Sequence, residues 1–132
     1  RLTSIEIDPA LAAALRERMA GTNVTVVEGD ATAMPFPDGS FTAALSFTML
    51  HHVPYDRQDA LLGEACRVLR PGGAFVGLDS TPSFTWNLAH VFDDRNPVDP
   101  RRFKARLGAA GFTEISVRRG AKGGFSWRAT RP

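Results

Sequence analysis

The sequence has few of the features that mark secreted, metal-bound or membrane-spanning proteins. It contains a single cysteine, Cys66, so it cannot form an internal disulfide, and that cysteine has no Cys or His companions at metal-ligand spacing. No apolar run approaches the roughly 20 residues that cross a bilayer, and the N-terminus carries no signal-peptide pattern. We therefore expect a cytoplasmic protein with no metal site and no membrane partner.

The composition is that of a soluble globular protein. Of its 132 residues, 43% are hydrophobic and 23% are charged, close to the averages for packed domains. Compact domains cluster near roughly 100–150 residues. We therefore predict a single domain over residues 1–132.

The charge of the chain says little about its partners. The formal net charge is only +2, although arginines and lysines gather late in the sequence, which leaves open a basic C-terminal face or a solvated mixed surface. Aromatic residues are not interleaved with these charges as a nucleic-acid platform requires. The mixed surface is the favoured interpretation, and we expect no nucleic-acid partner.

The N-terminal part predicts a strand, a helix and a second strand. Residues 2–7 predict the first strand, and Asp8-Pro9 supplies an N-cap followed by proline at the first helical position. Residues 24–27 are β-branched and predict a short buried strand. The helix between them is indicated by apolar residues at helical spacing before a terminating glycine: Leu11, Leu15, Met19 and Gly21.

Glycines and prolines then predict a loop over residues 29–40. Residues 41–47 resume an apolar run and predict a strand. We expect Asp56 to cap the following helix, Pro71-Gly72-Gly73 to stop it, and residues 74–78 to form another strand. The apolar positions of that helix are Leu61, Leu62, Ala65 and Leu69.

The last part of the sequence predicts a helix and a hairpin. Residues 80–100 mix a short helix with loop, whereas residues 100–110 predict a basic amphipathic helix that Gly111 ends. Residues 113–119 and 125–130 flank a Gly-Ala-Lys-Gly-Gly turn and predict an antiparallel hairpin. Because strands and helices alternate before it, we expect an α/β fold with a parallel sheet, right-handed crossovers and helices on both faces.

Three separated segments carry a family resemblance: Ser4-Ile5-Glu6-Ile7-Asp8-Pro9; residues 29–41, followed by Leu50-His51-His52-Val53; and residues 67–73. In this order and spacing they resemble class I S-adenosylmethionine-dependent methyltransferases of the small-molecule branch. The final hairpin also resembles the family's antiparallel end. The resemblance implies a Rossmann-like, mostly parallel sheet, S-adenosylmethionine as cofactor and methyl transfer to a small-molecule acceptor.

The resemblance places the adenosine half of the cofactor at two strand ends. Glu6, followed by Ile7, would accept hydrogen bonds from the ribose hydroxyls, unless it is only a solvated strand-end charge. Asp8 is the rival acid, but helix capping is the favoured role for it. Asp30 would accept from the adenine amino group and the Ala31 N–H would meet a ring nitrogen, unless Asp30 only forms a turn.

Further residues are assigned to the reacting half of the site. Ser46 and Phe47 would line the methionine half of the cofactor. His51 or His52 would take a proton from the acceptor, although either histidine could instead cap or pack under the loop. The remaining candidates have plain core packing as the alternative: Met34 for the adenine plane, and Phe84, Trp86, Asn87, His90 and Phe92 for the acceptor.

The family's first strand and its glycine-rich turn are missing from the sequence, and Thr42 stands where the family usually has an acid. We therefore expect an N-terminally truncated methyltransferase domain. A partner could supply the strand, two copies could complete the sheet by oligomerisation or strand exchange, or the fold could persist without cofactor. The alternative function is a non-catalytic remnant or partner-binding module; a nicotinamide-dependent oxidoreductase shares the strand-end acid but accounts for neither Asp30 nor the two histidines.

Overall fold

A computed structural model of the protein describes residues 1–80, 96–120 and 123–132. These residues form two compact units, Arg1–Pro35 and Phe36–Pro132, which we describe separately. The prediction of a single domain stays a prediction. The acceptor-side candidates Phe84, Trp86, Asn87, His90 and Phe92, and most of the predicted mixture of helix and loop around them, lie outside the described residues.

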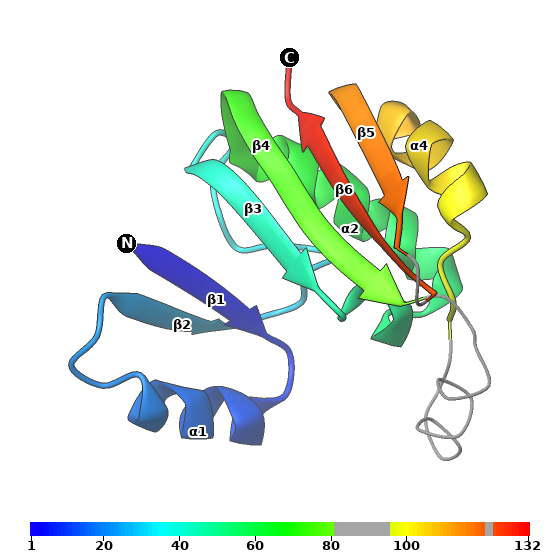
Figure 1. Ribbon diagram of the computed structural model, residues 1–132. Coiled ribbons are helices and arrows are strands. Elements are labelled where there is room, and N and C mark those ends of the chain that lie inside the picture. The colour runs from blue at the N-terminus through cyan, green and yellow to red at the C-terminus, as the bar shows by residue number, and fades with distance from the viewer. Residues whose placement is uncertain (81–95, 121–122) are drawn as a thin grey trace. The chain divides into compact units, whose positions relative to one another are not determined.

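The N-terminal unit is a strand, a helix and a second strand, as predicted. It consists of β1 (Leu2–Glu6), α1 (Pro9–Arg18) and β2 (Val24–Glu28). The two strands pair in parallel, so that Glu6 at the end of β1 lies opposite Glu28 at the end of β2. In Figure 1, α1 lies beside this pair of strands. The carboxyl ends of both strands therefore meet at one edge of the unit.

Asp8 starts α1 and confirms the predicted cap. Its Oδ1 accepts hydrogen bonds from the backbone N–H groups of Ala10 (2.8 Å) and Leu11 (3.0 Å), and Pro9 follows in the first turn. These amides have no partner within the helix, so the carboxylate satisfies donors that α1 cannot. The carboxylate of Asp8 thus acts on the helix, as the sequence favoured.

Replacing Asp8 with alanine is expected to lower the free energy of unfolding by about 1 kcal/mol. Two amides at the start of α1 would lose their acceptor. Urea unfolding followed by circular dichroism measures the change. Asp8→Ser, which keeps an accepting oxygen, serves as the control and should retain most of the stability; equal losses in both variants would contradict a capping role.

The described residues of the C-terminal unit, 36–80, 96–120 and 123–132, form one mixed sheet, two α-helices and a short 3-10 helix. Its sheet has the order β3-β4-β6-β5; β3 and β4 are parallel, and β6 pairs antiparallel with both β4 and β5. Figure 1 shows β6 between β4 and β5, which confirms the predicted terminal hairpin. The elements are β3 (Phe41–Phe47), η1 (Leu50–His52), α2 (Tyr55–Val68), β4 (Leu69–Ser80), α4 (Pro100–Ala109), β5 (Thr113–Arg119) and β6 (Gly124–Thr130).

The helices α2 and α4 lie on the same side of the sheet (Figure 1). Aromatic rings fill the space between them and the strands: Phe103 of α4 contacts Phe125 and Trp127 of β6, with ring centroids 5.4 and 4.8 Å apart. On the opposite face Leu45 and Phe47 are 55% and 54% exposed. Helices on both faces of the sheet therefore stay a prediction.

The boundaries of α2 differ from those predicted. Asp56 does not cap the helix, because the helix starts directly after Pro54, whose carbonyl accepts from the amides of Arg57 and Gln58. The helix also ends earlier, at Val68, and Leu69 is a fully buried residue of β4 that pairs with Phe41. Proline disfavours helical backbone in the residue before it, so the chain turns extended ahead of Pro71. The Pro-Gly-Gly segment accordingly lies within β4.

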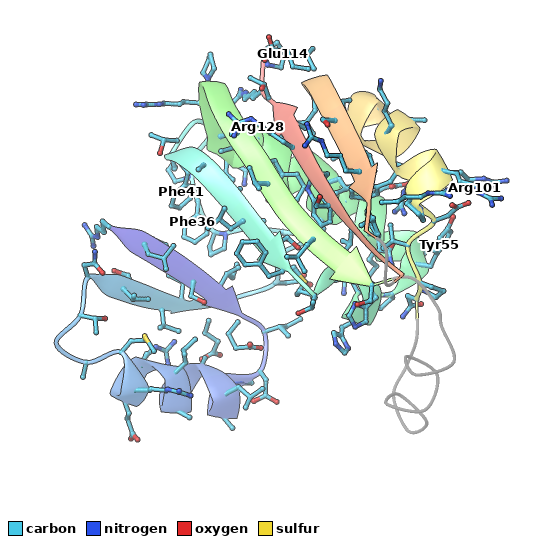
Figure 2. All side chains as sticks on the ribbon, viewed as in Figure 1. Phe36, Phe41, Tyr55, Arg101, Glu114 and Arg128 are labelled. Carbon is cyan, nitrogen blue, oxygen red and sulfur yellow. The ribbon has the colours of Figure 1, made fainter. Side chains whose placement is uncertain are left out.

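The predicted loop ahead of β3 is fastened to α2 by one arginine. Arg67 donates from Nη1 to Asp38 Oδ1 (2.7 Å) and to the carbonyl oxygen of Phe36 (2.8 Å), and from Nε to Glu64 Oε1 (2.6 Å). Phe36 also packs edge to face on Phe41, with ring centroids 5.0 Å apart (Figure 2). Arg67 and this ring pair fix the chain where it enters the central strand.

Candidate functional site

The turn after β3 carries the two candidate histidines. Thr48, the first residue beyond the strand, has φ +48°, a left-handed conformation that is strained for a β-branched side chain. Its N–H donates to the carbonyl of Leu78 at 2.9 Å, which holds the start of the turn against β4. The chain then forms η1, whose residues Leu50 and His51 are buried.

His51 is paired with a buried carboxylate from the neighbouring strand. Its Nδ1 lies 2.5 Å from Asp79 Oδ1, and its backbone N–H donates to Asp79 Oδ2 at 3.2 Å. Ser80 N–H also donates to Asp79 Oδ1, at 2.6 Å. His51 is 3% exposed and Asp79 is 1% exposed. Because β3 and β4 run parallel, the two residues meet beyond the same edge of the sheet.

This arrangement fixes the chemistry of the imidazole. An ionised carboxylate can only accept hydrogen bonds, so the ring hydrogen sits on Nδ1 and the basic lone pair on Nε2. A carboxylate in this position also stabilises the imidazolium that forms when Nε2 takes a proton. The His51–Asp79 pair therefore has the arrangement that an oriented general base requires, and the catalytic role of His51 stays a prediction.

The structure separates the two histidines that the sequence left equivalent. His52 is exposed, whereas His51 is buried. Their ring centroids lie 4.1 Å apart with an interplanar angle of 40°. Since His51 holds the carboxylate contact, its imidazole is the better candidate for the base, with His52 beside it.

In the N-terminal unit, the two acids assigned to the cofactor lie at the same strand edge. Glu6 ends β1, and its Oε1 accepts from the N–H of Asp8 at 3.0 Å. Its carbonyl accepts from Gly29 N–H at 2.9 Å, which ties the end of β1 to the start of the segment holding Asp30. Parallel pairing of β1 and β2 thus accounts for the approach of two acids distant in sequence.

The turn geometry considered for Asp30 is present. Its Oδ1 accepts from both the N–H and the hydroxyl of Thr32, each at 2.8 Å. Ala31 and Met34 are half-buried nearby in the sequence, and Ile7 is 62% exposed. The turn is consistent with a structural role for Asp30 and leaves its adenine contact a prediction.

The pair assigned to the methionine half ends β3 as predicted, but its two side chains point to opposite faces. Ser46 is 4% exposed, and its Oγ has no hydrogen-bond partner among the residues that the structure describes. Phe47 is 54% exposed. The cofactor roles of Ser46 and Phe47 stay predictions.

Sequence reasoning missed Asp79. It is the last but one residue of β4, in a run that otherwise reads as an apolar strand. One signal existed: Phe75, Gly77 and Asp79 share a strand face by period 2, and a carboxylate on a buried face needs a partner. Finding that partner requires the register of β3 against β4.

Two broader predictions concern metals and membranes. Over residues 1–80, 96–120 and 123–132, no group of three or more His, Cys, Asp or Glu side chains is placed to hold a metal ion. In the same part of the chain, no helix is both long enough and apolar enough to cross a bilayer.

Comparison with known proteins identifies the family. Residues 1–77 match the family described as "Methyltransferase domain". The chain belongs to this family. The methyltransferase domain is 44% identical over 69 residues to a fatty-acid O-methyltransferase of Mycolicibacterium smegmatis, and the matched region covers 52% of this chain and 24% of that protein. It is 38% identical over 96 residues to a ubiquinone/menaquinone biosynthesis C-methyltransferase of Methylobacterium nodulans, covering 70% and 37%.

The methyltransferase domain also has the fold of solved members. It resembles the crystal structure of a SAM-dependent methyltransferase from Thermotoga maritima with a TM-score of 0.82 and 24% sequence identity, covering 98% of this chain and 72% of that one. This likeness confirms the α/β, Rossmann-like fold. The chain spans only about a quarter to a little over a third of the length of the two curated relatives.

Proposed function

We propose that this methyltransferase domain transfers a methyl group from S-adenosylmethionine to a small-molecule acceptor, with His51 as the general base. The observation that carries the proposal is the buried His51–Asp79 pair, with an Nδ1 to Oδ1 distance of 2.5 Å, in a chain that belongs to a methyltransferase family. His51 follows the end of β3 and Asp79 is the last but one residue of β4, and open α/β sheets bind ligands at the carboxyl ends of their strands.

The residues at the edge of β1 and β2 suit the adenosine half of the cofactor. Glu6 and Asp30 supply carboxylate oxygens, which accept hydrogen bonds from hydroxyl and amino groups. Ala31 would offer its backbone N–H to a ring nitrogen, with Ile7 and Met34 as apolar neighbours of the base and sugar. Ser46 and Phe47 would meet the methionine half. When bound, S-adenosylmethionine supplies an electrophilic methyl group on a sulfonium.

His51 would act on the acceptor. Its Nε2 would take a proton from an acceptor O–H, N–H or acidic C–H as that atom becomes the nucleophile, and Asp79 would stabilise the resulting imidazolium. Positioned general bases contribute typically about 10²–10⁴-fold to rate. Because the sulfonium leaving group needs no activation, the remaining work is orientation of the acceptor and exclusion of water.

The two named relatives act on a fatty acid and on quinone precursors by name, which supports a largely apolar small molecule as the acceptor here. These relatives favour methyl transfer over a non-catalytic remnant or partner-binding module. Completion of the sheet by oligomerisation or strand exchange remains a separate proposal, as does a cytoplasmic location.

The cofactor assignment predicts that Glu6→Gln weakens S-adenosylmethionine binding by roughly 10- to 100-fold, because a hydrogen bond to a charged group contributes about 1.5–3 kcal/mol. Isothermal titration calorimetry measures the dissociation constant. Asp30→Asn should weaken binding in the same direction.

The matched control is Glu28→Gln. Glu28 lies opposite Glu6 in the β1–β2 register, is exposed, and lies 3.8 Å from Arg16 across a surface ion pair. Its loss should leave the affinity unchanged. Equal affinities for wild type and Glu6→Gln would remove Glu6 from the site, and absence of binding by the wild-type chain would favour the non-catalytic alternative.

A further inference from the structure

Gln58, which the sequence did not single out, is a fully buried polar side chain beside the histidine turn. It is the fourth residue of α2 and is 0% exposed. Burying an amide costs free energy unless its polar atoms are hydrogen-bonded. A leucine or methionine would fill the same space without that cost, so the contacts of the amide need an explanation.

The amide nitrogen of Gln58 binds the backbone on both sides of the histidines. Its Nε2 lies 3.2 Å from the carbonyl oxygen of Leu50 and 3.2 Å from that of Val53, which precede and follow the His51–His52 pair. It also donates to the carbonyl of Asn96 at 2.8 Å. The turn is thus held from inside the unit by a single side chain.

Asn96 adds a second set of contacts to the same turn. Its backbone N–H donates to the carbonyl of His51 at 3.1 Å, and its Oδ1 accepts from the N–H of Tyr55 at 3.2 Å. Together, Gln58 and Asn96 bind the carbonyls of Leu50, His51 and Val53. The backbone of the histidine turn is therefore fixed independently of the Asp79 contact.

Arg106 of α4 sets the orientation of the Gln58 amide. Arg106 Nη1 donates to Gln58 Oε1 at 3.0 Å, while its Nε donates to Asp59 Oδ1 at 2.6 Å. Its guanidinium lies 5.5 Å from the centroid of the Tyr55 ring at the start of α2. A flipped amide would place its NH₂ against the guanidinium and its oxygen against three carbonyls. The arginine thus holds the amide nitrogen toward the turn.

The strained backbone at Thr48 explains why the turn needs the contacts of Gln58 and Asn96. A β-branched residue at φ +48° persists only where the surroundings over-determine the backbone, and such strain gathers at functional sites. Thr48 is the first residue of the turn whose carbonyls Gln58 and Asn96 bind. Without the hydrogen bonds from Gln58 and Asn96, the strained turn would be free to relax, and His51 would move away from Asp79.

We propose that Gln58 is a positioning residue for the base: it fixes the Leu50–Val53 turn so that His51 keeps its short contact with Asp79. This inference rests on the proposed function for its catalytic meaning. That Gln58 maintains the His51–Asp79 hydrogen bond is a statement about geometry alone. It does not depend on methyl-transfer activity and is measured separately.

The test compares Gln58→Met with wild type in the full chain. Methionine keeps the volume and removes all four polar contacts of the amide, with the carbonyls of Leu50, Val53 and Asn96 and with Arg106. Proton NMR should show the His51 Nδ1 hydrogen downfield in the wild type, as expected for an imidazole N–H that donates to a buried carboxylate, and the signal should be lost in Gln58→Met. In methyl-transfer assays kcat should fall by up to roughly 100-fold, with the KM for S-adenosylmethionine unchanged.

Two further variants keep the test decisive. Ala65→Gly destabilises the buried side of the same helix without removing a hydrogen bond to the turn, so its NMR signal should persist. If Gln58→Met does not fold, Arg106→Met leaves the glutamine in place and releases its orientation, and should weaken the same signal. If Gln58→Met folds and keeps both the NMR signal and kcat, the proposal is overturned. If Gln58→Met does not fold, the same result in Arg106→Met overturns it. If wild type shows no methyl transfer, the proposed function fails while the NMR comparison still decides the role of Gln58.

Discussion

Asp79→Asn is expected to lower methyl transfer by roughly 10²–10⁴-fold, the usual contribution of a positioned general base. The carboxylate accepts from His51 Nδ1 and from the backbone N–H groups of His51 and Ser80. An amide has only one accepting oxygen, so at least one of these donors would face the amide NH₂. The imidazole would then lose its orientation or its tautomer, and Nε2 would no longer be the basic atom. Initial rates at saturating S-adenosylmethionine measure the loss.

The control for this variant is Asp56→Asn, which removes a carboxylate from the exposed first turn of α2. It should leave the rate unchanged. The affinity for S-adenosylmethionine should also be unchanged in Asp79→Asn, because the proposed role of the His51–Asp79 pair is to take a proton from the acceptor and not to bind the cofactor. A full rate in a folded Asp79→Asn would show that the pair is only structural.

Companion variants separate the two histidines. His51→Gln should lose as much activity as Asp79→Asn, and the double variant should lose little more, because the two residues act as one unit. His52→Gln should cost less, since His52 is exposed and the buried carboxylate of Asp79 binds His51. A larger loss of activity from His52→Gln than from His51→Gln would identify His52 as the general base.

Gly77→Ala is expected to produce the largest loss of stability, about 3 kcal/mol or more, a large share of the roughly 5–15 kcal/mol that stabilises a typical domain. Gly77 lies in register between Ser46 of β3 and Trp127 of β6. A Cβ there would lie 2.2 Å from Trp127 Cζ2 and 2.4 Å from the carbonyl oxygen of Ser46. The indole covers the glycine and the neighbouring backbone cannot retreat, so the sheet must distort.

Urea unfolding followed by tryptophan fluorescence measures this loss. Gly63→Ala is the matched control: Gly63 lies within α2 and has open space around the added carbon, so alanine should stabilise the chain by about 0.5–1 kcal/mol through helix propensity. Trp127→Val in the Gly77→Ala background should recover part of the loss. Equal stabilities of wild type and Gly77→Ala would refute the packing argument.

Local signals in the sequence predicted most elements. Asp8-Pro9 combines a capping acid with a proline in the first helical turn, and α1 starts there. The helix predicted from residue 100 is α4, which starts at Pro100. β-branched and apolar runs bounded by glycine and proline marked the strands. These features depend on only a few neighbouring residues, so they can be recognised in the sequence without knowledge of the fold.

The errors and omissions arose where distant residues decide the structure. Leu69 continues the apolar spacing of α2, yet its pairing with Phe41 and the proline two residues later place it in β4. Asp79 and Gln58 acquire their roles from the register of β3 against β4 and from the packing of α4, and neither is encoded near them. The sequence could therefore name both histidines but could not choose between them.

Because Cys66 is the only cysteine of the chain, the reactivity of its thiol can report transient opening of the structure around it. Cys66 is 8% exposed on the buried side of α2, and burial raises the pKa of its thiol, so little reactive thiolate exists near neutral pH. Its Sγ would lie 3.4 Å from a Cβ placed at Gly111, just beyond α4. Alkylation at this position therefore requires transient opening between the two helices, and its rate gives the local opening free energy of the unit that holds His51 and Asp79.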